Sequence, residues 1–320
     1  MSRSVVVTGA AGFVGASVVA RLATDERNLV TAVVRNRSSD CYTGCEPVYA
    51  ADLAAPDLDF PFLRGASVVV HLANRVHVPA GSPHVSLAEF RRVNVAGTIN
   101  LARRAAARGV QRLVYVSSIG VNGNRTGESP FRETDPPSPQ EPYAQSKWEA
   151  EQGLRSVEIE TGMEVVIIRP PLVHGPDAPG NFGRLLRLVR SGIPLPFGMT
   201  RNRRSLIGID NLVDFILVCM DHPAASGENF VVSDGEDVST PDLVRGLASS
   251  MGRPALLVPI PLWLMTTGAS VFGMQDTVQS LLGSLQVDAG KAHRMLNWRP
   301  PVSLDEGLRR SVQALGARAP

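Results

Sequence analysis

The sequence predicts an α/β protein with a doubly wound parallel sheet and a smaller, discontinuous C-terminal α/β domain. Short apolar runs rich in β-branched residues alternate with helix-like segments over the first 170 residues. A glycine-rich turn follows the first run, and repeated prolines end the alternation from Pro170 onwards. Continuously apolar strands that alternate with helices are typical of a parallel sheet covered on both faces.

Length and composition limit the class of protein. The chain has 320 residues, enough for one domain of ordinary size and a smaller second one. Its formal net charge of +2 gives no reason to expect nucleic acid as a partner. Its three cysteines are too few for a disulfide framework. Cys41 and Cys45 are not accompanied by a second Cys or His pair, so no metal site is predicted.

The N-terminus and the longest apolar segment predict a cytoplasmic protein. Residues 1–4 lead directly into a strand, without the features of a signal peptide. The segment 262–272 is shorter than the roughly 20 residues that span a membrane, and it follows Pro259 and Pro261. We expect a buried or lid helix there and no stable membrane insertion; a helix that dips into a membrane surface is the alternative.

The expected elements follow one another along the chain. Strands are predicted at 4–7, 29–34, 67–72, 113–116 and 164–168. Helices are predicted at 15–23, 90–108 and 143–161. Beyond Pro170, a strand at 230–232 returns to the sheet, and helices are predicted at 242–251, 262–272 and 304–312. The expected domains are a cofactor domain, 1–170 plus about 205–233, and a substrate domain, about 171–204 and 234–320.

Gly9, Gly12 and Gly15 form a GxxGxxG pattern between the first strand and the first helix. Glycine permits a tight turn, a close approach of the backbone to a pyrophosphate, and tight packing of helix on strand. The helix N-terminus then presents free N–H groups to the phosphates. The pattern predicts a Rossmann-type dinucleotide site, and the neighbouring positions expected at the cofactor are Ala11, Phe13 and Val14.

The end of the second strand indicates which dinucleotide binds. An acidic residue there would accept hydrogen bonds from the adenosine ribose. Here the strand ends in Arg35, Asn36 and Arg37, with no acid. Arg35 and Arg37 could clamp a 2′-phosphate, so NADP(H) is favoured over NAD(H). The alternative is that both arginines are solvated loop charges.

Further cofactor contacts are expected at other strand ends, where open α/β sheets bind ligands. Asp52 and Leu53 follow a short strand-like run and are expected at the adenine edge, although Asp52 could equally be a turn residue. Leu72, Ala73 and Asn74 end the fourth strand. The remaining expected cofactor contacts are Asn94, Ser117, Tyr143, Lys147, Pro170 and Val173.

Tyr143 and Lys147 are four residues apart on a predicted helix, so their side chains share one face. A free tyrosine has a pKa near 10. An ammonium at about 4–5 Å supplies roughly 3–4 kcal/mol at an effective dielectric near 20, so we expect Lys147 to lower the pKa of Tyr143 towards neutrality. Tyr143 could then act as an acid in reduction and as a base in oxidation. The alternative is an unrelated pair on a surface helix.

Ser118 follows the strand 113–116 and is expected to hydrogen-bond the substrate oxygen, with Ser117 as its rival. Asn94, on the preceding helix, could brace Lys147 through water or backbone, or be an amide that faces only its own helix. Ile119 and Gly120 follow Ser118, where a dehydratase needs an acid pair. Elimination of water is therefore not expected.

These motifs together resemble the extended short-chain dehydrogenase/reductase superfamily over nearly the whole chain. The similarity rests on TGxxGxxG at 8–15, His71-Leu72-Ala73-Asn74, the Asn94 helix, Ser118 and the YxxxK of Tyr143 and Lys147. Segments 204–214 and 288–300 are similar to its NAD-dependent epimerase/dehydratase branch, whose members act on nucleotide-activated sugars. Segments 75–78, 117–123 and 230–236 resemble proteins of the UDP-N-acetylquinovosamine dehydrogenase type, and the chain as a whole is also similar to UDP-glucose 4-epimerases.

The resemblance implies a substrate side. Asn181 would bind a diphosphate or sugar oxygen, and Arg204 would pair with the diphosphate of UDP, with Arg201 and Arg203 as rivals. Substrate contacts are then expected from Ser118, Tyr143, Asn181 and Arg204. His77 and Val173 are candidates for the sugar and nicotinamide neighbourhood. Members of the superfamily often dimerise through a four-helix face made by the Asn94 and Tyr143 helices, so a homodimer is implied.

The leading hypothesis is an NADP(H)-dependent reductase for the C4 keto group of a UDP-4-keto-6-deoxy-N-acetylhexosamine, which implies a role in surface polysaccharide (lipopolysaccharide O-antigen) assembly. The alternative is a 4-epimerase of UDP-glucose or UDP-N-acetylglucosamine that retains NAD. Arg35 and Arg37 favour an exchangeable cofactor and hence the reductase. A redox-sensing binding module, which would lack Tyr143 or Lys147, and a reductase of non-nucleotide ketones or aldehydes are further possibilities.

Overall fold

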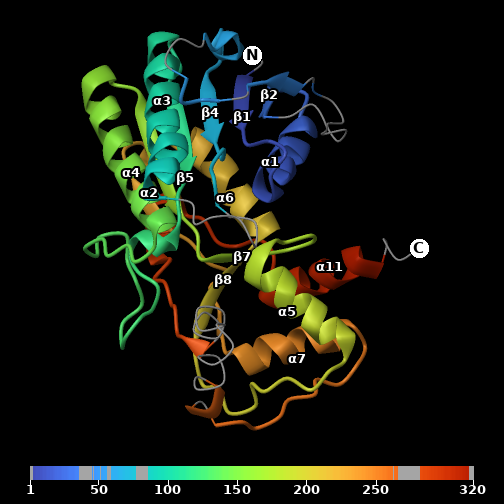
Figure 1. The fold of residues 1–320 in the computed structure, drawn as a ribbon. Helices are drawn as coiled ribbons and strands as arrows, with labels where there is room; N and C mark the ends of the chain where they lie inside the picture. Colours follow the sequence, from blue (N-terminus) through green and yellow to red (C-terminus); the bar gives the residue numbers. More distant parts are fainter. Residues whose placement is uncertain are drawn as a thin grey trace.

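The computed structural model describes residues 3–35, 45, 47–50, 52–55, 59–76, 86–261, 263–265 and 282–316. Figure 1 shows a large sheet with helices on both faces, and below it a second region that carries a small sheet and further helices. Four features of the sequence analysis lie wholly or mostly outside the described residues: Arg37, Cys41, His77 and the segment 262–272.

The large sheet is parallel throughout and has the strand order β3-β2-β1-β4-β5-β6-β9. Its strands are β1 (Arg3–Thr8), β2 (Asn28–Val34), β3 (Pro47–Tyr49), β4 (Val68–His71), β5 (Arg112–Val116), β6 (Glu164–Arg169) and β9 (Asn229–Val231). The order reverses between β1 and β4, and ligands bind at such a switch point in doubly wound folds. The predicted fold class is confirmed.

Apolar residues on both faces of each strand explain why the sheet is buried between two layers. Val5 and Val7 pack into the core formed with α1 (Phe13–Ala23) and α6 (Ile209–Asp221). Val6 packs into the opposite core, formed with α3 (Gly97–Ala107) and α4 (Pro142–Thr161). Adjacent side chains of a strand point to opposite faces, so continuously apolar runs require a cover on each side.

The predicted helix 90–108 is interrupted. It begins as the short helix α2 (Leu87–Phe90), continues as a π-helix over Arg91–Ala96, and becomes α3 from Gly97. A Cβ atom at Gly97 would lie 3.6 Å from Cβ of Leu53, so the helix passes closely over the loop after β3. Single π turns inside helices occur frequently at functional sites, and this one contains Asn94.

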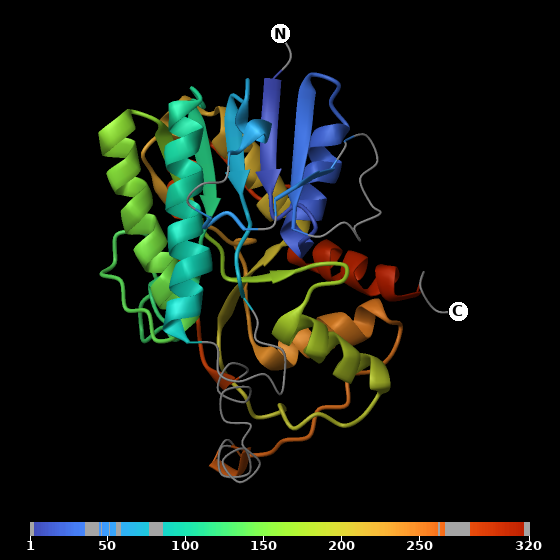
Figure 2. The same ribbon diagram turned by 45° about the horizontal axis from the view of Figure 1, so that its top comes forward.

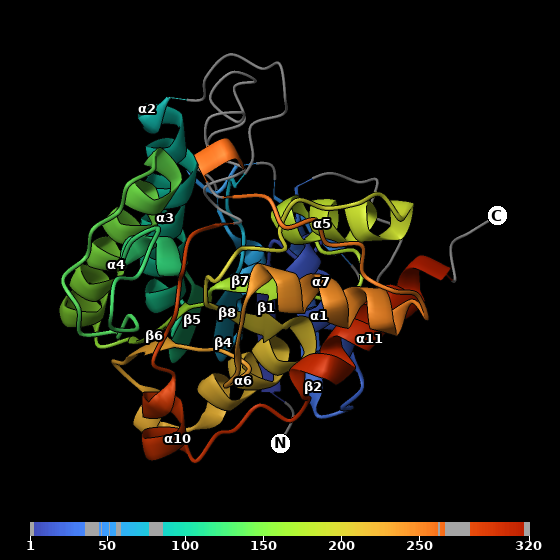
Figure 3. The same cartoon turned by 90° about the horizontal axis from the view of Figure 1, so that it is seen from below.

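The small sheet has the order β10-β8-β7, with β7 parallel and β10 antiparallel to β8. Its strands are β7 (Leu172–His174), β8 (Arg204–Gly208) and β10 (Asp237–Val238). Figures 2 and 3 show three helices gathered beside it, α5 (Gly180–Ser191), α7 (Thr240–Ser250) and α11 (Leu304–Gly316). Their apolar faces form a third core, separate from the two cores of the large sheet.

Shorter elements complete the fold. Short 3₁₀ turns lie at Pro61–Leu63, Ile119–Val121 and Pro223–Ala225. The helix α10 (Gly290–Leu296) and Trp298 pack into the large-sheet core with α6. β8 belongs to the small sheet, whereas α6 and β9 belong to the large one. The division of the chain into two domains stays a prediction.

Within the described part of the chain, no helix combines the length and the apolar character needed to cross a membrane.

Candidate active site

The glycine loop is shaped by contacts that exclude side chains. Gly9 has φ of +68°, and a Cβ atom there would lie 2.6 Å from the backbone N of Ala73. A Cβ at Gly15 would lie 2.1 Å from the carbonyl oxygen of Gly9. The loop can therefore pack against the end of β4 only with glycine at these positions. Gly12 is the N-cap residue of α1 and has no side chain to cap the first N–H groups.

This loop fits a dinucleotide pyrophosphate. Ala11 is exposed beside it, and Phe13 and Val14 form the first turn of α1. The backbone N–H groups of a first helical turn, together with the helix dipole, favour a bound phosphate. Phe13 packs against the large-sheet core and also against the core of the small-sheet region. A Cβ at Gly175, just after β7, would lie 3.2 Å from Cζ of Phe13.

A buried hydrogen-bonded chain joins the strand ends beneath the loop. Oγ1 of Thr8 lies 2.6 Å from Nδ1 of His71, and Nε2 of His71 lies 2.8 Å from Oγ1 of Thr98. The backbone N of Ala73 donates to Thr8 at 3.3 Å. Burial, aided by the charge of Lys147, lowers the pKa of His71 to about 3. His71 is therefore a neutral bridge between β1, β4 and α3, which fixes the edge where Leu72 and Ala73 emerge.

The expected adenosine side is described in part. Arg35 directly follows β2 and is exposed. Asp52 accepts a hydrogen bond from the backbone N of Ala54 at 2.9 Å and forms an ion pair with Arg92 at 2.5 Å. The pKa of Asp52 is lowered, mainly by the hydrogen bond from Ala54. Asp52 thus forms the turn that was its alternative role. Asn74 donates to the carbonyl of Leu72 at 3.2 Å.

The structure brings Ser118, Tyr143 and Lys147 to one end of the sheet. Ser118 follows β5, while Tyr143 and Lys147 lie on the first two turns of α4. A Cβ at Gly120 would lie 3.3 Å from both Oγ of Ser118 and Cβ of Ala144, so the serine lies beside the start of α4. The ring of Tyr143 packs edge-on against Phe90, with centroids 6.2 Å apart.

Burial governs the charges of this group. Lys147 donates to the carbonyl of Val116 at 2.8 Å, and its Nζ lies 4.3 Å from the ring centroid of Tyr115. Burial lowers the pKa of Lys147 to about 7, against the opposing effect of Glu151. Burial also raises the pKa of Tyr143. The expectation that Lys147 brings the pKa of Tyr143 towards neutrality is therefore not met, because desolvation disfavours the charged form of both groups.

The two serines have different surroundings. Ser117 is buried and its Oγ donates to Oε1 of Glu151 at 2.5 Å. Ser118 is only partly buried, and its Oγ accepts from the backbone N of Gly120 at 3.1 Å. A hydroxyl group has a donor proton besides its acceptor lone pairs, so Ser118 can still donate to a substrate oxygen. This arrangement favours Ser118 over Ser117.

Sequence reasoning missed an ion pair behind the group of Ser118, Tyr143 and Lys147. Arg169 binds both carboxylate oxygens of Glu151, at 3.0 and 2.5 Å, and donates to Asn122 at 3.0 Å. Both charged side chains are 1% exposed. Glu151 lies one further helical turn beyond Lys147 on the same face of α4, and Arg169 ends an otherwise apolar strand. The positions of Glu151 and Arg169 in the sequence could have indicated this pair, because a buried arginine requires an acidic partner.

Asn94 ties the loop after β4 to the start of α4. Its Oδ1 accepts from the backbone N of Arg75 at 2.8 Å, and its Nδ2 donates to the carbonyl of Arg75 at 3.1 Å. Nδ2 also donates to Oγ of Ser146 at 3.0 Å, and Ser146 donates to the carbonyl of Tyr143. Asn94 therefore orients the turn that carries Tyr143, and its expected support of Lys147 stays a prediction.

Two of the four expected substrate residues, Asn181 and Arg204, come from the small-sheet region, which also holds the expected cofactor residue Val173. Arg204 begins β8 and donates to the carbonyl of Gly283 at 3.1 Å, and burial lowers its pKa. Asn181 lies in the first turn of α5. Val173 is the middle residue of β7. The carbonyl of Pro170 accepts a hydrogen bond from the backbone N of Ile119 at 3.0 Å, which joins the end of β6 to the turn after Ser118.

The site combines a dinucleotide-binding loop with a Ser, Tyr and Lys group at one edge of a parallel sheet. This combination defines a nicotinamide-dependent oxidoreductase of the short-chain kind. The sequence profile of the NAD dependent epimerase/dehydratase family matches residues 5–233. The chain belongs to this family and is therefore an enzyme of the NAD-dependent epimerase/dehydratase kind.

Individual relatives agree with this assignment. A UDP-glucose 4-epimerase from Vibrio cholerae is 42% identical over 319 residues, which cover 98% of this chain and 96% of the relative. The fold matches that of a UDP-glucose 4-epimerase from Thermotoga maritima solved with UDP-glucose, with a TM-score of 0.78, 22% identity and coverage of 98% and 99%. It also matches a UDP-glucuronic acid 4-epimerase from Bacillus cereus solved with NAD, with a TM-score of 0.78, 20% identity and coverage of 98% and 99%.

Proposed function

We propose that the protein is a 4-epimerase of a UDP-hexose that retains its nicotinamide cofactor through the reaction. The support is the grouping of Ser118, Tyr143 and Lys147 at the same edge of the parallel sheet as the glycine loop, together with the similarity over nearly full length to a UDP-glucose 4-epimerase. Ser118 is followed by Ile119 and Gly120, neither of which is an acid that could support elimination of water. Epimerisation requires only oxidation at C4, rotation of the sugar and reduction on its other face.

The roles of the residues follow from their positions. Tyr143 accepts the proton of the C4 hydroxyl as the C4–H hydride leaves, and returns that proton when the hydride comes back. Ser118 donates to the C4 oxygen and holds it in place. Because burial raises the pKa of Tyr143, its phenolate needs positive charge nearby, which protonated Lys147 supplies. The nicotinamide, when bound, supplies the hydride acceptor and donor.

The test of this proposal is turnover of UDP-glucose and of UDP-N-acetylglucosamine by the purified protein without added cofactor, followed by proton NMR of the anomeric signals. The expected result is an equilibrium mixture of both C4 epimers and, after denaturation, release of bound nicotinamide nucleotide. Tyr143→Phe should abolish the mixture and keep the bound nucleotide. A protein that never forms the second epimer from either substrate would contradict the proposal.

The second candidate is the reductase of a UDP-4-keto-6-deoxy-N-acetylhexosamine. The exposed Arg35 at the end of β2 supports it, since arginine there suits the 2′-phosphate of NADP(H). Titration of the protein with NADPH and NADH distinguishes the two candidates. Tighter, exchangeable NADPH binding that is lost in Arg35→Asp favours the reductase, whereas retained NAD that does not exchange favours the epimerase.

We also propose a homodimer built on α3 and α4 and a cytoplasmic location. α3 and α4 lie side by side on the outside of the large sheet (Figure 1), and Ile159 of α4 is 86% exposed. An exposed apolar side chain on a paired helical layer suits a four-helix contact between two copies. Light scattering should give the mass of a dimer, and Ile159→Lys should give that of a monomer.

A further inference from the structure

The helices α5 and α7 and the segments that follow them lie at the end of the molecule opposite the N-terminus (Figure 1). Several large apolar side chains of the segments after these two helices are exposed. The exposed fractions run from 39% for Val258 to 66% for Trp263. The exposed apolar residues there are Ile193, Met199, Leu256, Val258, Trp263 and Leu264. The backbone N of Gly198 donates to the carbonyl of Val258 at 3.0 Å, so the segments after α5 and after α7 run beside each other. Several exposed apolar side chains on adjacent segments call for an explanation, which a single exposed leucine does not.

Backbone pairing turns two of these side chains, those of Leu256 and Val258, outwards. The backbone N of Leu195 donates to the carbonyl of Leu256 at 2.8 Å, and the backbone N of Val258 donates to the carbonyl of Leu195 at 2.8 Å. Leu195 is buried in the core of the small-sheet region, and Leu257 packs against that core. Because alternate residues of an extended chain point to opposite sides, burial of Leu257 turns Leu256 and Val258 towards solvent.

The same segments are strongly basic. Residues 180–204 and 240–265, which include α5 and α7, together contain eight arginines and a single acidic residue, Asp242. Arg187, Arg190 and Arg253 are exposed, and Arg253 donates to the carbonyl of Arg190 at 2.8 Å, which places the end of α5 beside the loop after α7.

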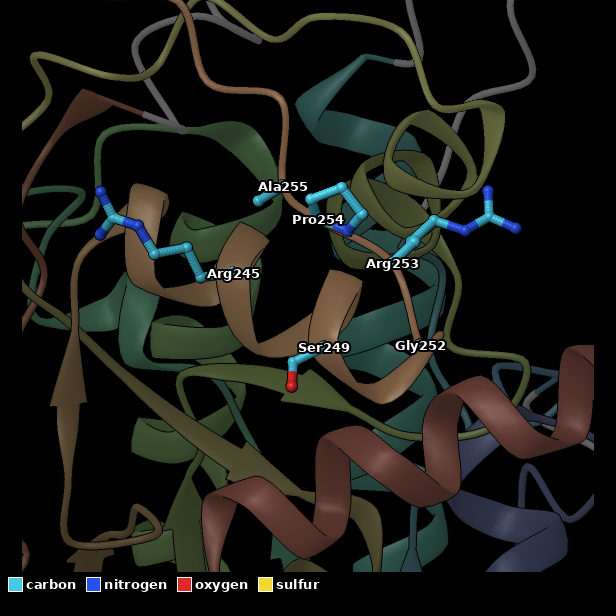
Figure 4. A pocket seen from close by; sticks show the side chains of 6 residues that line it. All are labelled: Arg245, Ser249, Gly252, Arg253, Pro254 and Ala255. Atoms are coloured by element: carbon cyan, nitrogen blue, oxygen red, sulfur yellow. The ribbon is translucent and has the colours of Figure 1, made fainter.

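An open cavity lies at the edge of this basic surface. In Figure 4, Arg245 and Arg253 extend from opposite sides of a cavity of about 430 Å³. Its lining residues are Arg245, Ser249, Gly252, Arg253, Pro254 and Ala255. Arg245 pairs with Asp242 at 2.6 Å, so the positive charge that faces solvent comes from Arg253 and its neighbours on α5.

We propose that this surface docks peripherally on an anionic phospholipid bilayer. The docking surface, named here the apolar–arginine face, consists of the six exposed apolar residues together with Arg187, Arg190 and Arg253. Exposed aliphatic side chains and a tryptophan enter the boundary between headgroups and acyl chains, while arginines bind the lipid phosphates. The face lies on the surface of the bilayer and spans nothing.

The positive charge of the apolar–arginine face favours an anionic bilayer, rather than a second copy of the chain, as its binding partner. A symmetric dimer through this face would bring the arginines of two copies together, and like charges across an interface oppose association. A surface rich in anionic lipid has the opposite charge and also offers an apolar interior to Trp263 and Leu256. The inference is independent of the reaction proposed above.

The experiment is sedimentation of the full-length protein with vesicles of phosphatidylcholine alone or mixed with phosphatidylglycerol. The protein should bind the mixed vesicles, bind phosphatidylcholine far less, and dissociate as salt is added. Arg190→Glu with Arg253→Glu should lower partitioning at least about 25-fold, since each arginine near such a surface contributes about fivefold. Arg21→Glu, an exposed site on α1, is the matched control and should bind as the parent does.

A second variant separates the apolar contribution. Leu256→Gln with Trp263→Gln should lower partitioning at least about tenfold, with an unchanged melting temperature, whereas Leu29→Gln on the 58% exposed Leu29 should not. Spin-labelled lipids should quench tryptophan fluorescence of the parent and not of Trp263→Phe. Binding of the parent that is equal for both vesicle types, or a dimer that Leu256→Gln dissociates, would overturn the proposal.

Discussion

The large-sheet side and the small-sheet side of the candidate site are built differently. On the large-sheet side, buried contacts between adjacent strands and helices fix the chemical groups, as with the chain from Thr8 through His71 to Thr98. On the small-sheet side, Arg204 is only partly buried and donates to the carbonyl of Gly283, which lies in a connecting segment outside any helix or strand. The first side is therefore suited to unchanging chemistry, and the second is suited to variation in substrate.

The largest effect tests the chemical side directly. Tyr143→Phe removes the group that carries the proton and keeps the ring packed against Phe90, so epimerase kcat should fall by about 10³-fold. Measured melting temperature and nucleotide content should not change. A residual rate within tenfold of the parent would show that another group transfers the proton.

The buried ion pair tests how the chemical side is supported. Glu151→Gln leaves the charge of Arg169 buried and unpaired, so the free energy of unfolding should fall by about 3–5 kcal/mol. Glu151→Met with Arg169→Met removes both charges and should recover much of this loss. Chemical denaturation measures both variants; equal stability of the single and double variants would show that the pairing contributes little.

The same substitution has a catalytic readout that a purely structural role would not move. Glu151 raises the pKa of Lys147, which lies at about 7. In Glu151→Gln, Lys147 should lose its proton at lower pH, and the alkaline limb of kcat should shift to lower pH. If the alkaline limb of the kcat–pH profile did not shift, Glu151 would have no influence on the protonation of Lys147.

A smaller effect concerns His71, whose folded-state pKa of about 3 lies below its ordinary value. Between about pH 6.5 and about pH 3 the unfolded chain binds a proton that the folded chain does not, so stability is lost as pH falls, by up to about 1.4 kcal/mol per pH unit. His71→Asn should flatten this slope in denaturation experiments across that range. His293→Asn, at an exposed histidine, is the control and should keep the slope of the parent.

The smallest effect tests the substrate side. If Arg204 pairs with the diphosphate, Arg204→Met should raise KM for the UDP-sugar roughly tenfold and change kcat little. The adjacent and exposed Arg203→Met should leave KM unchanged. The reverse result would assign the diphosphate to Arg203, and a fall in kcat with unchanged KM would place Arg204 in the chemistry.

The sequence predicted those parts of the site that short-range pattern determines. The glycine loop, the alternating strands and the spacing of Tyr143 and Lys147 are local features with a direct geometric meaning. The pairing of Glu151 with Arg169 depends on how α4 lies on β6, and no local pattern selects one partner. The raised pKa of Tyr143 was missed for the same reason, because it follows from burial, which the full fold determines.

Phe13 has a consequence for thermodynamic coupling between the two regions. The first residue of α1 packs into both the large-sheet core and the small-sheet core, and its ring lies against Gly175 beyond β7. Any ligand that orders the first turn of α1 therefore also restrains the segment that leads to the substrate residues. The binding of nucleotide and the binding of substrate are then linked by a coupling free energy. By thermodynamic linkage, nucleotide changes the affinity for substrate by the same factor as substrate changes the affinity for nucleotide.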